Sequence, residues 1–177
     1  RRLVCSPGMA VVCTRTDEPH EVELAMFLTK VEYMREGEPL SAAIARLAAE
    51  KGGSLGFSWD SCGLDDNECY VIAHLLKGGA LAQLETMLFL EDNFITGVGL
   101  TILSKAFSAG ALPHIHDLSL VLNQQLGDDG LTALAEALSD GGLPKLKKLW
   151  LDRKYHTYPQ LVAVCQGRNV KLEHTYQ

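Results

Sequence analysis

The chain has 177 residues, of which 47% are hydrophobic and 21% are charged, a composition typical of one globular domain or a short repeat array. Its net charge of −6 argues against unspecific binding to nucleic acid or to anionic lipid. The apolar runs are much shorter than the roughly 20 residues that cross a bilayer, so we expect no membrane span.

The first part of the chain predicts two helices. Residues 21–36 (EVELAMFLTKVEYMRE) and residues 39–53 (PLSAAIARLAAEKGG) both carry apolar residues at helical spacing. We assign the first helix to an N-terminal cap that spans residues 1–39, and the second to an incomplete leading unit of a repeat array. Because the chain opens with Arg1-Arg2 and not with Met, we interpret it as a fragment, a tagged chain or a processed product.

From there on, the sequence repeats itself. AFSAGALPHIHDLSL at residues 106–120 aligns with ALSDGGLPKLKKLWL at residues 137–151, which lies 31 residues later. A weaker copy, KGGAL at residues 77–81, precedes SAGAL at residues 108–112 by the same interval. Self-similarity at a fixed period of this size indicates an array of stacked supersecondary units.

Each unit has two halves with different periods. The first half alternates, as in Leu118-x-Leu120, and predicts a short strand with one buried face. The second half, for example residues 131–138, spaces its apolar residues as a helix does. Asp128-Asp129 provides a predicted N-cap for that helix, and Gly141-Gly142 permits a left-handed turn after it.

Between each strand and helix stands a polar residue, namely Cys62, Asn93 or Asn123. A buried side chain at this place can bond the backbone groups of the loop, and Asn is suited to it. Strand, polar residue, helix and glycine turn resemble the ribonuclease-inhibitor-like leucine-rich repeats, with their motif LxxLxLxx(N/C)xL. The resemblance covers residues 40–154. It implies an α/β solenoid with a short curved parallel sheet, helices on the convex side and a cap at both ends.

The fourth unit departs from this pattern, because Lys154 stands where the next Asn is expected. We therefore predict that the repeats end there and that residues 155–177 form a C-terminal cap. Its segment PQLVAVCQGRNVKLE predicts a terminal helix followed by a strand.

Local patterns that suggest chemistry have simpler interpretations. His114-Ile115-His116-Asp117 resembles half of a metal motif, but its repeat partner is Lys145-Leu146-Lys147-Lys148, which is typical of a solvated surface. Asp65-Asp66-Asn67-Glu68 lacks the ligand spacing of a calcium loop and predicts a helix cap. There is no GxSxG, HExxH or Gly-rich phosphate loop. We therefore expect no metal, no cofactor and no enzymatic activity.

Cysteine usage indicates the compartment. Five cysteines are spread along the chain without a CxxC pair: Cys5, Cys13, Cys62, Cys69 and Cys165. This usage is typical of reduced, mostly buried thiols in an intracellular protein. We expect a cytoplasmic or nuclear location, with an organelle reached through a removed presequence as the alternative.

The strand alternation predicts which side chains leave the core. The residues between the two strand apolars are Ser58, Phe89, Ser119 and Trp150, and two positions further on stand Asp60, Glu91, Val121 and Asp152. Parallel strands lie about 4.8 Å apart, so these residues form two columns on the concave sheet face. Exposed positions that flank the columns include Met87, Asp92 and Leu122.

Large aromatic side chains beside carboxylates are typical of an interaction hot spot. Our hypothesis is that the concave face binds a protein segment through Phe89 and Trp150. The carboxylates would favour a basic partner: Asp60, Glu91, Asp92 and Asp152. The alternative is that Trp150 is covered by the C-terminal cap and Phe89 by a neighbouring side chain.

The predicted function is therefore a non-catalytic interaction module, that is, a scaffold, an adaptor or an accessory subunit of a larger assembly. One alternative is a regulator of an enzyme, since the repeats are also similar to those of the Ran GTPase-activating proteins, from which no catalytic residue carries over. Another is an inhibitor that plugs an enzyme. The fold does not choose among these roles, because function depends on the site.

Overall fold

The computed structural model describes residues 56–79, 82, 84–123 and 125–174. The predicted N-terminal cap and the predicted helices at residues 21–36 and 39–53 lie outside this range. The described elements, in chain order, are β1 (Phe57–Ser58), α3 (Asp66–Lys77), β2 (Met87–Phe89), α4 (Gly97–Ser108), β3 (Asp117–Ser119), α5 (Gly127–Ser139), β4 (Lys148–Trp150), the 3-10 helix η1 (Arg153–Tyr155), α6 (Pro159–Gly167) and β5 (Lys171–Glu173).

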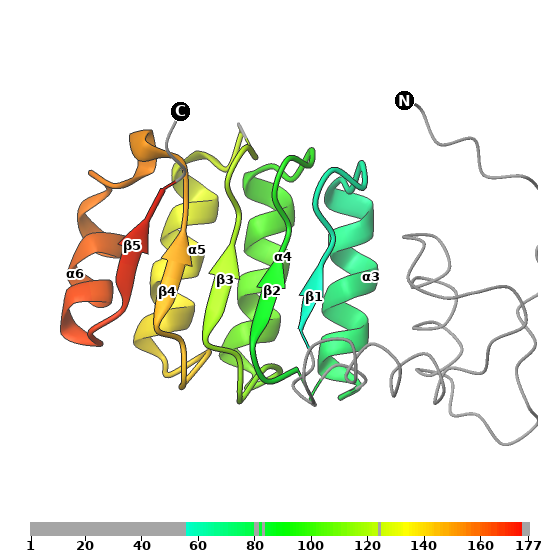
Figure 1. The fold of residues 1–177 in the computed structure, drawn as a ribbon, viewed down its shortest axis with the longest axis horizontal. Coiled ribbons are helices and arrows are strands. Elements are labelled where there is room, and N and C mark those ends of the chain that lie inside the picture. Colours follow the sequence, from blue (N-terminus) through cyan, green and yellow to red (C-terminus); the bar gives the residue numbers. More distant parts are fainter. Residues whose placement is uncertain (1–55, 80–81, 83, 124, 175–177) are drawn as a thin grey trace, which may run out of the picture.

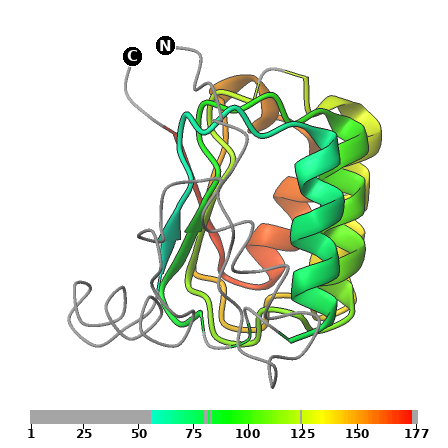
Figure 2. The ribbon, with the colours of Figure 1, turned by 90° about the vertical axis from the view of Figure 1, so that its right-hand side faces the viewer.

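The described residues form an α/β fold with one all-parallel sheet. Its five strands follow one another in chain order, so each strand pairs with the next one in the sequence (Figure 1). Leu88 lies beside Leu118, and Leu118 lies beside Leu149, which confirms the register that the repeat alignment predicts. Figure 2 shows the described helices together on one side of this sheet.

The core lies between the sheet and the helices. Strand residues such as Leu88, Leu118 and Leu149 are fully buried there, together with helix residues such as Leu103 and Leu134. Gly130 of α5 approaches α4 so closely that a Cβ atom at residue 130 would lie 2.8 Å from the Cα atom of Gly97. This contact fixes the spacing of the two helices, because no larger side chain fits between them.

Buried asparagines tie each loop to the unit before it. The Asn93 side chain accepts the amide N–H of Leu64 (3.0 Å) and donates to the carbonyl of Trp59 (2.9 Å). Asn123 repeats this arrangement one unit later, since it accepts from the Ile95 amide (3.1 Å) and donates to the Leu90 carbonyl (2.7 Å). The predicted role of these asparagines is confirmed.

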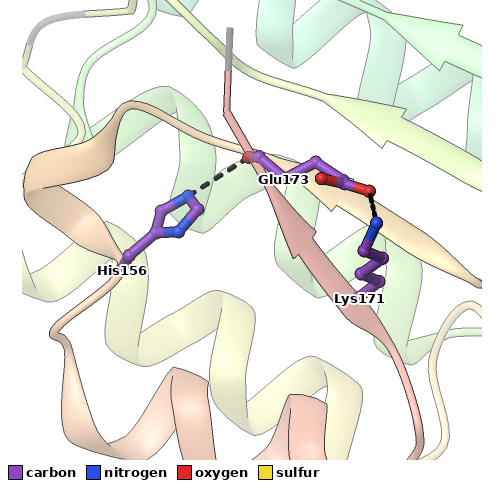
Figure 3. Close-up of polar contacts among 3 residues, drawn as sticks. All are labelled: His156, Lys171 and Glu173. Atoms are coloured by element: carbon purple, nitrogen blue, oxygen red, sulfur yellow. Dashed lines mark hydrogen bonds and ion pairs between the residues drawn. The ribbon is translucent and has the colours of Figure 1, made fainter. Parts of the chain in front are cut away.

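At the last strands, two residues replace the asparagine. The Tyr155 hydroxyl accepts the amide N–H of Leu126 (3.2 Å), which corresponds to the loop bonds of Asn93 and Asn123. The Nε2 atom of His156 lies 3.2 Å from the carbonyl oxygen of Leu151 and 3.1 Å from that of Glu173 (Figure 3). Carbonyls only accept, so Nε2 carries a proton. The sheet thus continues past Lys154, and the predicted terminal helix and strand are confirmed as α6 and β5.

The helices α3, α4 and α5 begin in three different ways. Asp65 caps α3 in a capping box with Glu68, as the sequence predicts, and hydrogen bonds from the amides of Asn67 and Glu68 lower the pKa of Asp65. Thr96 caps α4. The N-cap predicted for α5 is wrong: Asp128 and Asp129 lie in its first turn, because the helix already begins at Gly127 after an uncapped Leu126. Both carboxylates still compensate the helix dipole.

We predict that Leu149→Ala lowers the free energy of unfolding by about 2–5 kcal/mol, because it leaves a cavity under a fully buried strand residue. Denaturant titration of the variant measures this loss. Val71→Ala is the control, since Val71 of α3 is 41% exposed and its truncation leaves no cavity. An unchanged stability of Leu149→Ala would contradict the register.

Ser104 of α4 is a polar residue in the apolar core. Its side chain is buried, and its hydroxyl has no hydrogen-bond partner in the described part of the chain. The residues 31 positions before and after it are Ala73 and Ala135, both buried. We predict that Ser104→Ala raises the free energy of unfolding by about 1 kcal/mol, because it removes an unsatisfied buried hydroxyl. Thermal melting of the variant tests the sign, and a lower melting temperature would contradict it.

Candidate functional site

The sheet face opposite the helices carries the predicted aromatic residues. Phe89 lies beside Ser119 and Ser119 lies beside Trp150 in the strand register, as predicted. Phe89 and Trp150 are half-buried, and neither is sealed inside the molecule. The indole Nε1 of Trp150 is shielded and has no acceptor among the described residues, although buried indole N–H groups usually find one.

Ser119 lies between the two aromatic residues and is 0% exposed. The predicted exposure of this position is therefore wrong. The side chains at the same level of both neighbouring strands are much larger than a serine, so they shield it. Its hydroxyl donates to Oε1 of Glu91 (2.6 Å), which satisfies the buried oxygen.

All four predicted carboxylates accept hydrogen bonds from their own chain. Asp60 accepts the amide N–H of Glu91 (2.9 Å), and Asp92 accepts the hydroxyl of Ser61 (2.7 Å). Asp152 accepts the amide N–H of Leu122 (2.9 Å), and Glu91 accepts the hydroxyl of Ser119 (2.6 Å). The carboxylates thus connect neighbouring units, a structural role that the strand alternation does not predict.

The other predicted site residues differ in exposure. Met87 is half-buried and Leu122 is 37% exposed, whereas Val121 is 0% exposed. The prediction that Val121 is available to a partner is therefore wrong. Asp152 stands at the equivalent place of the next unit and accepts the amide N–H of Leu122, the residue after Val121.

Basic residues lie at the amino ends of the last two strands. Lys148 of β4 stands beside Lys171 of β5, and both are exposed. Lys171 forms an ion pair with Glu173 of the same strand (Figure 3). The sheet face is therefore not uniformly acidic: carboxylates gather toward the carboxyl ends of the strands and lysines toward the amino ends of β4 and β5.

Three exposed side chains that were not predicted as site residues lie away from the sheet face. Phe94 is 72% exposed, Tyr70 is 62% exposed and Val98 is 59% exposed. Phe94 and Val98 stand out when the units are aligned at the repeat interval, since Gly63 and Asn67 occupy the corresponding positions one unit earlier.

These apolar residues line two adjoining hollows at the loops between strands and helices. Phe94 and Leu122 line a hollow of about 440 Å³, and Tyr70 and Val98 line one of about 620 Å³. Thr96 and Gln125 line both hollows, so the two are continuous. We call this surface the loop groove, defined by Tyr70, Phe94, Thr96, Val98, Leu122 and Gln125.

The described cysteines are structural. Burial raises the pKa of Cys69 far above its usual range, and Asp66 and Glu68 raise it further. Burial also raises the pKa of Cys165 to about 11. Both thiols are therefore protonated at neutral pH and are poor nucleophiles. Cys62 is half-buried, and its thiol donates to the carbonyl oxygen of Asp60 (3.5 Å).

The described residues contain neither a cluster of metal ligands nor a helix that could span a membrane. No three His, Cys, Asp or Glu side chains among them come together as ligands for a metal ion. None of the helices described is both long enough and apolar enough to cross a bilayer. Comparison with known proteins found no protein family and no curated protein that matches the sequence.

We predict that Cys69 and Cys165 react slowly with a disulfide reagent at pH 7 in the folded protein and rapidly in denaturant. For Cys165, a pKa of about 11 leaves about one thiol in ten thousand ionised at this pH. A chain with Cys5→Ser and Cys13→Ser isolates the described thiols. Mass spectrometry of the labelled peptides measures each rate, with the half-buried Cys62 as the internal reference. Equal rates for all three thiols would contradict the prediction.

Proposed function

We propose that this chain is a non-catalytic protein-interaction module, built as a leucine-rich-repeat solenoid of the ribonuclease-inhibitor type. Three features support the solenoid: the strands follow in chain order, the helices gather on one face, and buried asparagines recur at the repeat interval. Parallel sheets are usually covered on both faces. The described elements cover only one face here, which leaves a sheet surface for a partner.

The observation that carries the proposal is the arrangement of Phe89, Ser119 and Trp150 in register on that face. The two aromatic side chains stand two strands apart, about 10 Å. The serine between them is fully buried. Two partly exposed aromatic residues around a dry centre have the composition of an interaction hot spot.

The partner is a protein segment that lies across the strands. Its basic side chains lie toward Asp60 and Asp152, whose carboxylates each have acceptor capacity beyond the hydrogen bonds described. Its acidic side chains lie toward Lys148. The face is small, which favours a role as an accessory subunit of a larger assembly.

The combined change of Phe89→Ala and Trp150→Ala tests the sheet face. Truncation of two aromatic anchors costs about 2 kcal/mol or more each, so the affinity for the partner falls by about several hundredfold or more. Affinity purification from the source cells, with quantitative mass spectrometry, identifies the proteins that the unaltered chain retains. Titration of the purified partner then measures the loss.

Val71→Ala is the matched control, because it truncates an exposed apolar residue on α3, away from the sheet face. Circular dichroism melting establishes that each variant is folded at the assay temperature. The proposal is wrong if the double variant binds the partner as tightly as the control does.

A further inference from the structure

The repeated units provide an internal comparison for the loop groove. Phe94 stands where the preceding unit has Gly63, and Val98 stands where it has Asn67. Asn67 and Val98 hold equivalent places, since the amide of each donates to the N-cap side chain of its own helix. The fold therefore accepts a polar residue at the place of Val98, so stability alone does not require the exposed isopropyl group.

The backbone holds Phe94 outward. Its neighbours Asn93 and Ile95 both point into the core, being 5% and 1% exposed. The amide N–H of Phe94 donates to the carbonyl oxygen of Leu64 (2.8 Å), which ties the loop of Phe94 to the loop of the preceding unit. The phenyl group is thus presented to solvent by a rigid loop, and a partner that covers it does not have to order the loop first.

Leu122 provides an independent observation. Ser61, Asp92 and Leu122 occupy the same turn in three successive units, and all three have positive φ angles, of 55°, 51° and 61°. This left-handed conformation is unfavourable for most side chains, and Asn, Asp and Gly tolerate it best. A partly exposed leucine here is unfavourable both for its backbone and for its solvation. Strain of this kind is concentrated at functional sites.

Charges around the loop groove are mainly negative. Asp92 lines the hollow beside Phe94, and Asp128 and Asp129 line the hollow beside Val98. Lys105 is the single cation among the described lining residues. The apolar surface is therefore bordered by carboxylates, and charge complementarity calls for a cationic partner.

We propose that the loop groove is a second binding surface, separate from the sheet face, and that it binds a peptide segment of a partner protein. The segment carries two bulky apolar side chains, one for each hollow, flanked by Lys or Arg. A second copy of this chain fits poorly, because two such grooves face to face would bring their carboxylates together, on a chain whose net charge is −6.

Selection from a phage-displayed library of random dodecapeptides, with the full chain as bait, tests the composition of the occupant. The enriched peptides are expected to combine large apolar residues with Lys or Arg. Fluorescence anisotropy of the best peptide then gives its Kd. We expect Phe94→Ser to raise this Kd about tenfold or more, and Asp128→Asn with Asp129→Asn to raise it about two- to fivefold. Added salt weakens the binding.

Leu122→Asn separates binding from stability. Asn adopts the left-handed conformation readily, so the melting temperature of this variant is expected to be unchanged or higher, while the Kd of the peptide rises. A residue with a purely structural role would show the reverse pattern: a lower melting temperature and an unchanged Kd.

The sheet-face variant with Phe89→Ala and Trp150→Ala is the control, and we expect it to bind the selected peptide like the unaltered chain. If the sheet face fails to bind its partner, this inference is therefore unaffected. If the loop groove fails to bind the selected peptide, the proposal for the sheet face is likewise unaffected. The inference is overturned if the library gives no binder, if the binders lack basic residues, or if Phe94→Ser binds them normally. Sedimentation tests whether the chain associates with itself. Self-association that is lost in Phe94→Ser would also overturn the inference, because it would assign the groove to a second copy.

Discussion

The described structure depends on the hydrogen bonds of its buried side-chain amides. Where a strand ends and its loop begins, backbone N–H and C=O groups leave the ladder while still inside the protein, and each would be costly if left unpaired. Asn93 and Asn123 pair these groups across adjacent units. One amide supplies both a donor and an acceptor, so it connects two loops and fixes the spacing of the strands below them.

The last strands meet the same requirement with different chemistry. Tyr155 provides the acceptor and His156 provides the donor, because Lys154 carries no acceptor and its side chain is exposed. Arg168 adds a further connection, since its guanidinium donates to the carbonyl oxygens of Leu138 in the last turn of α5 and of Gly142 and Leu143 after it. The shorter final unit is thus hydrogen-bonded to the unit before it, although it departs from the sequence pattern of the other units.

The hydrogen-bonded loops and the strand register also position the side chains of the two proposed binding surfaces. The sheet face presents Phe89 and Trp150 because the strand register brings them to one level. The loop groove presents Phe94 because Asn93 and Ile95 are anchored on either side of it. The carboxylates of Asp60 and Asp152 accept backbone amides of the neighbouring unit. They therefore hold the units together and also set the local charge.

The sequence by itself determined the strand positions, their parallel register, the buried asparagines and the capping of α3, because each follows from a repeat interval or from local hydrogen bonding. The tertiary structure alone decided which outward-pointing side chains stay accessible. Alternation predicts that Ser119 and Val121 leave the core, but both are covered, since exposure depends on the size and reach of residues on adjacent strands. The use of Tyr155 and His156 in place of Asn was likewise decided by tertiary contacts, which no local pattern contains.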